Sequence, residues 1–313
     1  MIWVAWRTQR LQLLVTVGLA LLLAFWVATT GLTVSQSNIW KYWTDGAVFA
    51  LYALPAIVGI GVGASLVAGE LDHRTQRLAW TQGMSRRQWL IWKIAVGAGV
   101  IVIASGLLVV LIQWWTSAAN IALTSSARGP TRPVIVPSVF DVTGIVIIGY
   151  ALFAFALGVA LGTVVRRPGW TFAAAVPIFI GARLLVRLDV RPHILAPATY
   201  SSPTGNYSPR LTTGWLLNSG ILPVGRTSPL PGHGWSTLPR RFTACMSAEK
   251  SQYAQTHVTP WAHCVVVNHL HYVVQYQPAS HYWPLQGAET AIFVAAAVLL
   301  LGLAVLGVNR ITA

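Results

Sequence analysis

The chain has 313 residues, of which 55% are hydrophobic and only 9% charged, and its formal net charge is +14. An ordinary soluble domain has about 25% charged residues, so this composition excludes that class and favours an integral membrane protein. The basic residues are spread over loops and accompany no nucleic-acid-binding motif, so we expect no nucleic-acid partner.

The apolar residues form blocks of about twenty, the length of a helix that crosses a bilayer. Each block must be helical, because backbone groups in hydrocarbon have to be hydrogen-bonded within their own segment. After a cytoplasmic amphipathic segment at residues 1–10, six spans are predicted, at Leu11–Leu32, Ala47–Ala68, Ile94–Trp115, Val142–Val165, Trp170–Leu188 and Ala288–Val308. The first block could also be a signal peptide, but its length favours an uncleaved helix.

The expected fold is therefore an all-α integral membrane protein with six transmembrane helices and a large, mostly irregular extracytoplasmic domain between helices five and six. Residues 11–188 form a membrane domain, residues 69–93 a cytoplasmic loop within it, residues 189–287 the outer domain, residues 288–308 the sixth helix, and residues 309–313 a cytoplasmic tail.

The orientation follows from the Lys and Arg residues of the short loops. Ten fall on one predicted side: Arg7, Arg10, Arg74, Arg77, Arg86, Arg87, Lys93, Arg166, Arg167 and Arg310. The two short loops opposite hold Lys41, Arg128 and Arg132. The richer side is cytoplasmic by the positive-inside rule, which places both termini there. Arginine outnumbers lysine 18 to 3, a bias typical of a GC-rich bacterial genome, so a bacterial plasma membrane is expected.

The two cysteines, Cys245 and Cys264, both fall in the predicted outer domain. In an oxidising compartment they favour a disulfide, and closing a loop of this size contributes on the order of 3 kcal/mol. Unpaired thiols and a metal site are the alternatives. The same domain holds seven of the eight histidines, and His269 and His271 would share a face if they lay on one strand. Because no carboxylate cluster or compact ligand spacing accompanies them, no metal site is predicted.

Within the outer domain, the composition of Pro192–Pro239 predicts irregular structure with turns and no helix. Val265–Val267 and Tyr272–Val274 are short β-prone runs. The aromatic residues between Tyr276 and Pro284 suit an anchor at the membrane interface, and contact with carbohydrate or lipid is the alternative function for them.

The chain contains no G-x-x-x-x-G-K-[ST], H-E-x-x-H or G-x-S-x-G motif and only seven carboxylates, so we expect neither enzymatic activity nor a bound cofactor. The remaining candidates for function inside the membrane are charges near span ends: Asp45, Asp141, Arg183, Arg187 and Glu289. Arg183 and Arg187 lie at a depth similar to that of Glu289, which predicts an Arg–Glu contact. Alternatively, the arginines extend to the interface and Glu289 lies in water.

The cytoplasmic loop at residues 69–93 combines apolar and basic side chains. Ser85 can cap a helix that begins at Arg86 and continues into the third span. Two short helices broken at Gly83 would form a docking surface, whereas an amphipathic segment lying on lipid is the alternative.

A family resemblance rests on this loop. Glu70, Thr75, Leu78, Ser85, Arg86 and Lys93 stand at the motif positions of the permease subunits of type-2 ABC exporters, with Arg74 where that family has glycine. The segments Trp3–Arg10 and Tyr276–Ser280 also resemble its actinobacterial branch.

The resemblance implies one half of a transporter, in which two permease copies, as a homodimer, work with two ABC ATPase subunits and contact membrane lipid. It implies that the loop is the coupling helix, with Glu70, Thr75, Arg77, Ser85, Arg86 and Trp89 at the ATPase; Arg77 and Arg86 would be ion-pair donors and Trp89 a buried anchor. A hydrophobic or amphipathic substrate would be exported. A non-transporting membrane sensor with a disulfide-bonded ligand-binding domain is the alternative, and a membrane enzyme using outer His and Asp residues is a third. Heterodimer formation stays open.

Overall fold

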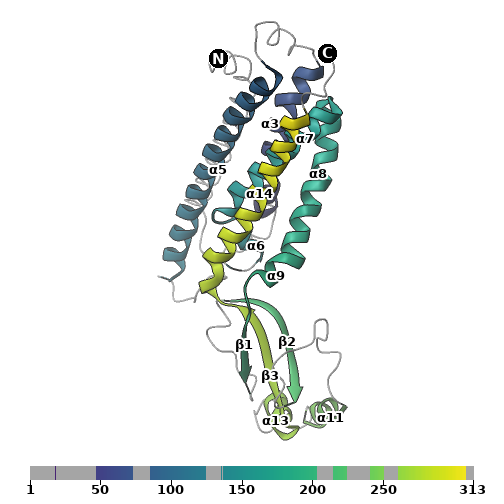
Figure 1. Ribbon diagram of the computed structural model, residues 1–313. Helices are drawn as coiled ribbons and strands as arrows, with labels where there is room; N and C mark the ends of the chain where they lie inside the picture. Colours follow the sequence, from purple (N-terminus) through teal and green to yellow (C-terminus); the bar gives the residue numbers. More distant parts are fainter. Residues whose placement is uncertain are drawn as a thin grey trace. The chain divides into compact units, whose positions relative to one another are not determined.

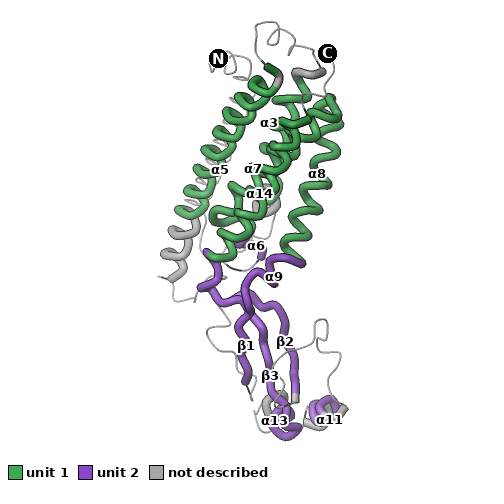
Figure 2. Tube along the Cα trace, in the orientation of Figure 1, with its two compact units in different colours: residues 1–131, 141–188, 284–313 green, residues 132–140, 189–283 purple. Residues whose placement is uncertain are grey.

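A computed structural model of the chain describes residue 18 and residues 47–72, 85–124, 135, 137–202, 214–223, 240–249 and 260–307. The predicted first span Leu11–Leu32, the segment 1–10 and the tail 309–313 therefore lie outside the described residues. The chain divides into two compact units, shown in Figure 2. Unit 1 comprises residues 1–131, 141–188 and 284–313, and unit 2 comprises residues 132–140 and 189–283.

Long apolar helices make up the described part of unit 1, and Figure 1 shows them running along one another. They are α3 (Ala47–Asp72), α5 (Arg86–Thr124), α7 (Val146–Val165), α8 (Pro168–Leu185) and most of α14 (Tyr282–Gly307). Along the chain, α8 continues through the π-helix η1 (Val186–Val190) into α9 (Arg191–Ile194).

Five described stretches are long and apolar enough to cross a membrane: Tyr52–Gly69, Arg87–Trp114, Val146–Val165, Pro168–Ile194 and Ala279–Gly307. They overlap the second to sixth predicted spans, so the prediction of a mostly helical chain with several candidate membrane helices is confirmed. A total of six helices stays a prediction, because the first span lies outside the described residues.

Glycine brings α3 and α7 into close contact. A Cβ atom at Gly59 would lie 2.7 Å from the carbonyl oxygen of Ala151, and one at Gly63 would overlap the carbonyl oxygen of Phe155. On the facing helix, a Cβ at Gly158 would lie 2.7 Å from the carbonyl oxygen of Ile60. Small residues four apart let helix backbones approach in this way, and in lipid such van der Waals packing replaces the hydrophobic effect as a source of association.

Unit 2 contains a three-stranded antiparallel sheet of β1 (Ala198–Ser202), β2 (Trp215–Pro223) and β3 (Leu270–Gln277), in the order β1-β3-β2. Tyr200 pairs with Val274, and a bulge lies between Leu216 and Asn218. Tyr272, Val274 and Tyr276 of β3 are buried against side chains of the two neighbouring strands. The unit also contains the helices α6 (Pro137–Phe140), α11 (Arg240–Glu249) and α13 (Pro260–Val267) and the 3-10 turn η3 (Ala279–His281).

The elements of unit 2 correct two expectations. β1 and β2 both lie within the segment expected to be irregular, because their partner β3 is remote in sequence and supplies the hydrogen bonds. Val265–Val267 is helical, as part of α13, although its residues favour strands. The helix begins at Pro260, which suits a first helical position, and local context overrides β propensity in so short a run.

The predicted disulfide is present and joins α11 to α13 through Cys245 and Cys264. Around it, Phe242, Val265 and Leu270 form a small buried cluster. His269 lies in a turn with a φ of 51°, whereas His271 lies in β3, so the two histidines do not share a strand. Among the described residues, no group of three or more His, Cys, Asp or Glu side chains could hold a metal ion.

Candidate functional site

Unit 1 encloses a group of polar side chains near the beginnings of α3, α7 and α14 and the end of α8. We call it the polar cluster, and its members are Asp141, Tyr150, Arg183, Arg187, Gln286 and Glu289. Asp141 is 2% exposed and Glu289 is 0% exposed. Ionisable groups within membrane-spanning segments are costly, so such a group indicates a function or a tightly matched set of partners.

Arg183 is bound on several sides within the polar cluster. Its guanidinium donates hydrogen bonds to the backbone carbonyl oxygens of Tyr52, at 2.9 Å, and Asp141, at 3.4 Å. It also lies 4.8 Å from the ring centroid of Tyr52 and 4.3 Å from that of Tyr150. These contacts join α3, α7 and α8 through one buried cation, and the aromatic faces replace part of its lost hydration.

Asp141 is the counterion of both arginines. Its Oδ2 atom lies 3.7 Å from a guanidinium nitrogen of Arg183 and 3.5 Å from one of Arg187. Arg187 belongs to η1, and π-helical turns inserted in α-helices occur frequently at functional sites. The widened turn therefore coincides with the point at which two cations share one carboxylate.

The beginning of α14 completes the cluster. The hydroxyl of Tyr150 donates a 2.6 Å hydrogen bond to Oε1 of Glu289. The amide nitrogen of Gln286 donates to the carbonyl oxygen of Thr143, and the backbone N–H of Val146 donates to Oε1 of Gln286 at 2.9 Å. Because the first N–H groups of a helix have no partner in their own helix, Gln286 caps α7 from a different helix.

The structure therefore places four of the five predicted charges in one region, whereas Asp45 lies outside the described residues. Arg183 and Arg187 both pair with Asp141, and Glu289 is linked to Arg183 through Tyr150, whose ring contacts the cation and whose hydroxyl contacts the carboxylate. A direct Arg–Glu contact stays a prediction. The alternative placed Glu289 in water, and the complete burial of this residue shows that the alternative is wrong on this point.

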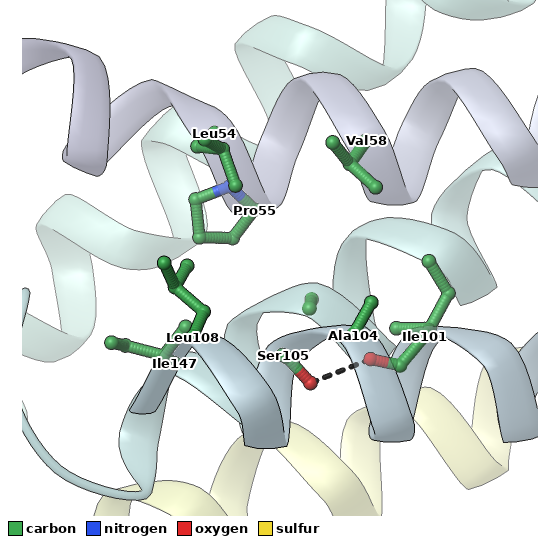
Figure 3. Close-up of a pocket in the computed structure, with 9 residues that line it drawn as sticks. Leu54, Pro55, Val58, Ile101, Ala104, Ser105, Leu108 and Ile147 are labelled. Carbon is green, nitrogen blue, oxygen red and sulfur yellow. Dashed lines mark hydrogen bonds between the residues drawn. The ribbon is translucent and has the colours of Figure 1, made fainter. Parts of the chain in front are cut away.

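An apolar cavity of about 30 Å³ lies between α3, α5 and α7, and Figure 3 shows its lining. Leu54, Pro55 and Val58 come from α3, and Ile147 from α7. The hydroxyl of Ser105 on α5 is bound at 2.6 Å to the carbonyl oxygen of Ile101 in the same helix. Apart from Ser105, the residues that line the cavity are apolar, so the cavity suits an apolar group.

The two ends of the loop at residues 69–93 are held together inside unit 1. Nζ of Lys93 donates to the carbonyl oxygen of Leu66 at 3.4 Å and lies 4.9 Å from the ring centroid of Trp89. At the beginning of α5, Oγ of Ser85 accepts a hydrogen bond from the backbone N–H of Gln88, and Oε1 of Gln88 accepts one from the N–H of Ser85. Ser85 thus caps the helix as predicted, in a reciprocal capping box.

The structure describes the other predicted loop residues only in part. Glu70 lies in the last turn of α3 and Arg86 is the first residue of α5, whereas Thr75 and Arg77 lie outside the described residues. Trp89 is 4% exposed and packs in the core of the chain itself, against residues that include Leu66 and Val62. The predicted contacts of these residues with an ATPase stay predictions.

Sequence reasoning missed Tyr150 and Gln286, because neither carries a charge that marks it inside an apolar run. It also missed the glycine pairs Gly59/Gly63 and Gly158/Gly162, although glycines four apart in a span are a readable signal for close helix packing.

No curated protein and no solved structure matches the chain. The family described as ABC-2 membrane transporter related matches residues 28–191, more than half of the 313 residues. That segment includes α3, α5, α7, α8 and the charged residues Asp141, Arg183 and Arg187. The chain therefore belongs to the ABC-2 membrane transporter related family.

Proposed function

We propose that the chain is the permease subunit of an ABC exporter, which moves a hydrophobic or amphipathic substrate out of the cell with ATP hydrolysed by a separate subunit. The observation that carries the proposal is the family match over residues 28–191, together with five described helices long and apolar enough to cross a membrane. The family implies an ABC ATPase partner, and the absence of a phosphate-binding loop from the 313 residues is consistent with hydrolysis by that partner.

We place the ATPase contact on the loop at residues 69–93, on the cytoplasmic side of a bacterial plasma membrane. The support is physical: Lys93 fastens α5 to the last turns of α3, and Ser85 fixes the first turn of α5. Because both ends of the loop are fixed in this way, a force applied to the loop moves α3 and α5 together. Glu70, Thr75, Arg77 and Arg86 are the proposed contacts, and Trp89 anchors the loop from within.

The proposed assembly has two permease copies, as a homodimer, and two ATPase subunits in contact with membrane lipid. ATP-driven association of the ATPase subunits would shift the permease between its inward-facing and outward-facing states, and the substrate would leave along the interface of the two copies. The apolar exposed side chains of α5, including Val102, Ile103 and Leu107, support contact with lipid or with another hydrophobic surface.

The test is co-purification of the tagged chain with the ATPase encoded beside its gene, with ATP hydrolysis as the second readout. Wild type is compared with Glu70→Ala and Arg86→Glu, and Arg167→Glu is the matched control because it is an exposed arginine between α7 and α8, outside the loop. We expect the two loop variants to lose the ATPase or its stimulation while the control keeps both. If wild type binds no ATPase, the exporter proposal is wrong and the sensor alternative replaces it.

A further inference from the structure

Arg183 and Arg187 both pair with Asp141, but they differ in how many other groups contact their guanidinium. Arg183 is 8% exposed and has two backbone acceptors and two aromatic faces. The side chain of Arg187 is 33% exposed, and its recorded partner among the described residues is Oδ2 of Asp141 at 3.5 Å. That separation exceeds the 2.7–2.9 Å or so of a charge-assisted hydrogen bond, so most of the five guanidinium N–H groups of Arg187 are available to another acceptor.

The position of Arg187 indicates which chemical class this acceptor belongs to. Arg187 lies within Pro168–Ile194, a stretch with the length and composition of a membrane span, next to the apolar and exposed Leu184 and Leu188. A molecule that reaches it from the bilayer presents hydrocarbon to the leucines and an acceptor to the guanidinium. The planar fork of arginine matches the oxygens of a phosphate or carboxylate, and phosphate is the usual anion of amphipathic membrane molecules.

We propose that Arg187 binds the phosphate group of an anionic amphiphile at this edge of the polar cluster. Asp141 holds the guanidinium in the empty state, and the phosphate takes its place when the ligand binds. Arg183 stays on Asp141 and the carbonyl of Tyr52, so the carboxylate remains paired after the exchange. The proposal concerns binding by this chain and rests on the proposed function only in treating the amphiphile as cargo.

The first test is a comparison of head groups on wild-type chain in a non-ionic detergent. Dioctanoyl phosphatidylglycerol and dioctanoylglycerol have the same acyl chains but only the first carries a phosphate, and native mass spectrometry measures how much of each is bound. We expect the anionic lipid to bind at least about tenfold more tightly, the factor equivalent to one charge-assisted hydrogen bond. Equal affinity of the two lipids overturns the proposal without any substitution.

Two variants then test the residues in opposite directions. Arg187→Gln is expected to lower the affinity for the phosphatidylglycerol to that for the dioctanoylglycerol, and Asp141→Asn to raise it several-fold by removing the competing carboxylate. Arg166→Gln, in the exposed turn after α7, is the matched control and is expected to bind as wild type does. A preference that survives Arg187→Gln, or that Asp141→Asn leaves unchanged or lowers, overturns the proposal.

If Asp141→Asn folds poorly, the change in its melting temperature on lipid binding provides a second test. Anionic lipid binds the folded state and so raises its melting temperature, and the rise is expected to be larger in Asp141→Asn than in wild type because the lipid supplies the missing countercharge. A smaller rise in Asp141→Asn than in wild type contradicts the exchange of Asp141 for phosphate.

Two sources of the phosphate, a resident membrane lipid and a transported amphiphile, are separated by ATP hydrolysis in the complex with the ATPase. A transported amphiphile raises the hydrolysis rate in a saturable way that Arg187→Gln abolishes, whereas a resident lipid binds without this dependence; both outcomes retain the binding site. Lipid binding is measured on the chain alone. A failure of lipid binding therefore does not contradict ATPase association, and a loss of ATPase association does not contradict lipid binding.

Discussion

The hydroxyl of Tyr150 donates a 2.6 Å hydrogen bond to the carboxylate of Glu289, and both side chains are fully buried. This bond joins α7 to α14, and the ring of Tyr150 also packs edge-on against Phe293 one turn further along α14. A polar and an apolar contact of the same residue therefore fix the pairing of these two helices.

Replacing Tyr150 with Phe removes the hydroxyl and keeps the ring. Glu289 then loses a buried donor, so we expect the free energy of unfolding to fall by about 1–3 kcal/mol. Reversible unfolding of the purified chain in mixed micelles measures the change. Tyr200→Phe removes a hydroxyl from β1 in unit 2 and serves as the control. An equal loss of unfolding free energy in both variants would show that the hydrogen bond to Glu289 does not stabilise the chain as expected.

Gly63→Ala tests the close approach of α3 and α7. The added methyl group overlaps the carbonyl oxygen of Phe155, so the helices must separate, and overpacking of this kind costs about 1–3 kcal/mol of stability. Gly61→Ala is a matched control in the same helix, because a Cβ there meets nothing within 4 Å. We expect the control to be neutral or slightly stabilising, since alanine favours a helix over glycine. Equal melting temperatures for the two variants would contradict the observed packing.

Trp89→Ala separates a role in the core from a role at the surface of the loop. Trp89 is 4% exposed, so its truncation is expected to lower the stability of the isolated chain by about 3–5 kcal/mol. Trp92, three residues later in α5, is 44% exposed, and Trp92→Ala is expected to change stability much less. Thermal unfolding without any ATPase provides the measurement, and similar losses in the two variants would count against burial of Trp89.

The disulfide between Cys245 and Cys264 predicts a simple labelling pattern. These are the two cysteines of the sequence, so a maleimide reagent should modify no cysteine in the non-reduced, denatured chain and two after reduction. Reduction should also make unit 2 more sensitive to protease, because cross-links of this loop size contribute about 3 kcal/mol. Modification without reductant would show that the two thiols are free.

The apolar runs predicted the second to sixth helices well. The run Ala47–Ala68 became α3 (Ala47–Asp72), and Val142–Val165 became α7 (Val146–Val165). Hydrophobic length is a local property, so it can be read without knowledge of neighbouring segments. The start of α5 at Arg86, eight residues before the predicted span, shows the limit of that signal: a Ser85 cap extends the helix beyond its apolar part.

Pairings between remote residues were less readable. The sheet pairs residues of β1 and β3 that are 70 to 78 positions apart in the sequence, and no local pattern indicates which strands will pair. The polar cluster shows the same limit, because helix depth placed the arginines level with Glu289 but not beside Asp141. Depth follows from position along one span, whereas the choice of partner depends on how helices rotate and pack against one another.

The most direct test of the permease assignment is recruitment of the neighbouring ATPase to membranes, with and without this chain. The account predicts that the ATPase sediments with membranes only when the chain is present, and that Arg86→Glu returns it to the soluble fraction while Arg167→Glu does not. An ATPase that stays soluble in the presence of the wild-type chain would contradict the account.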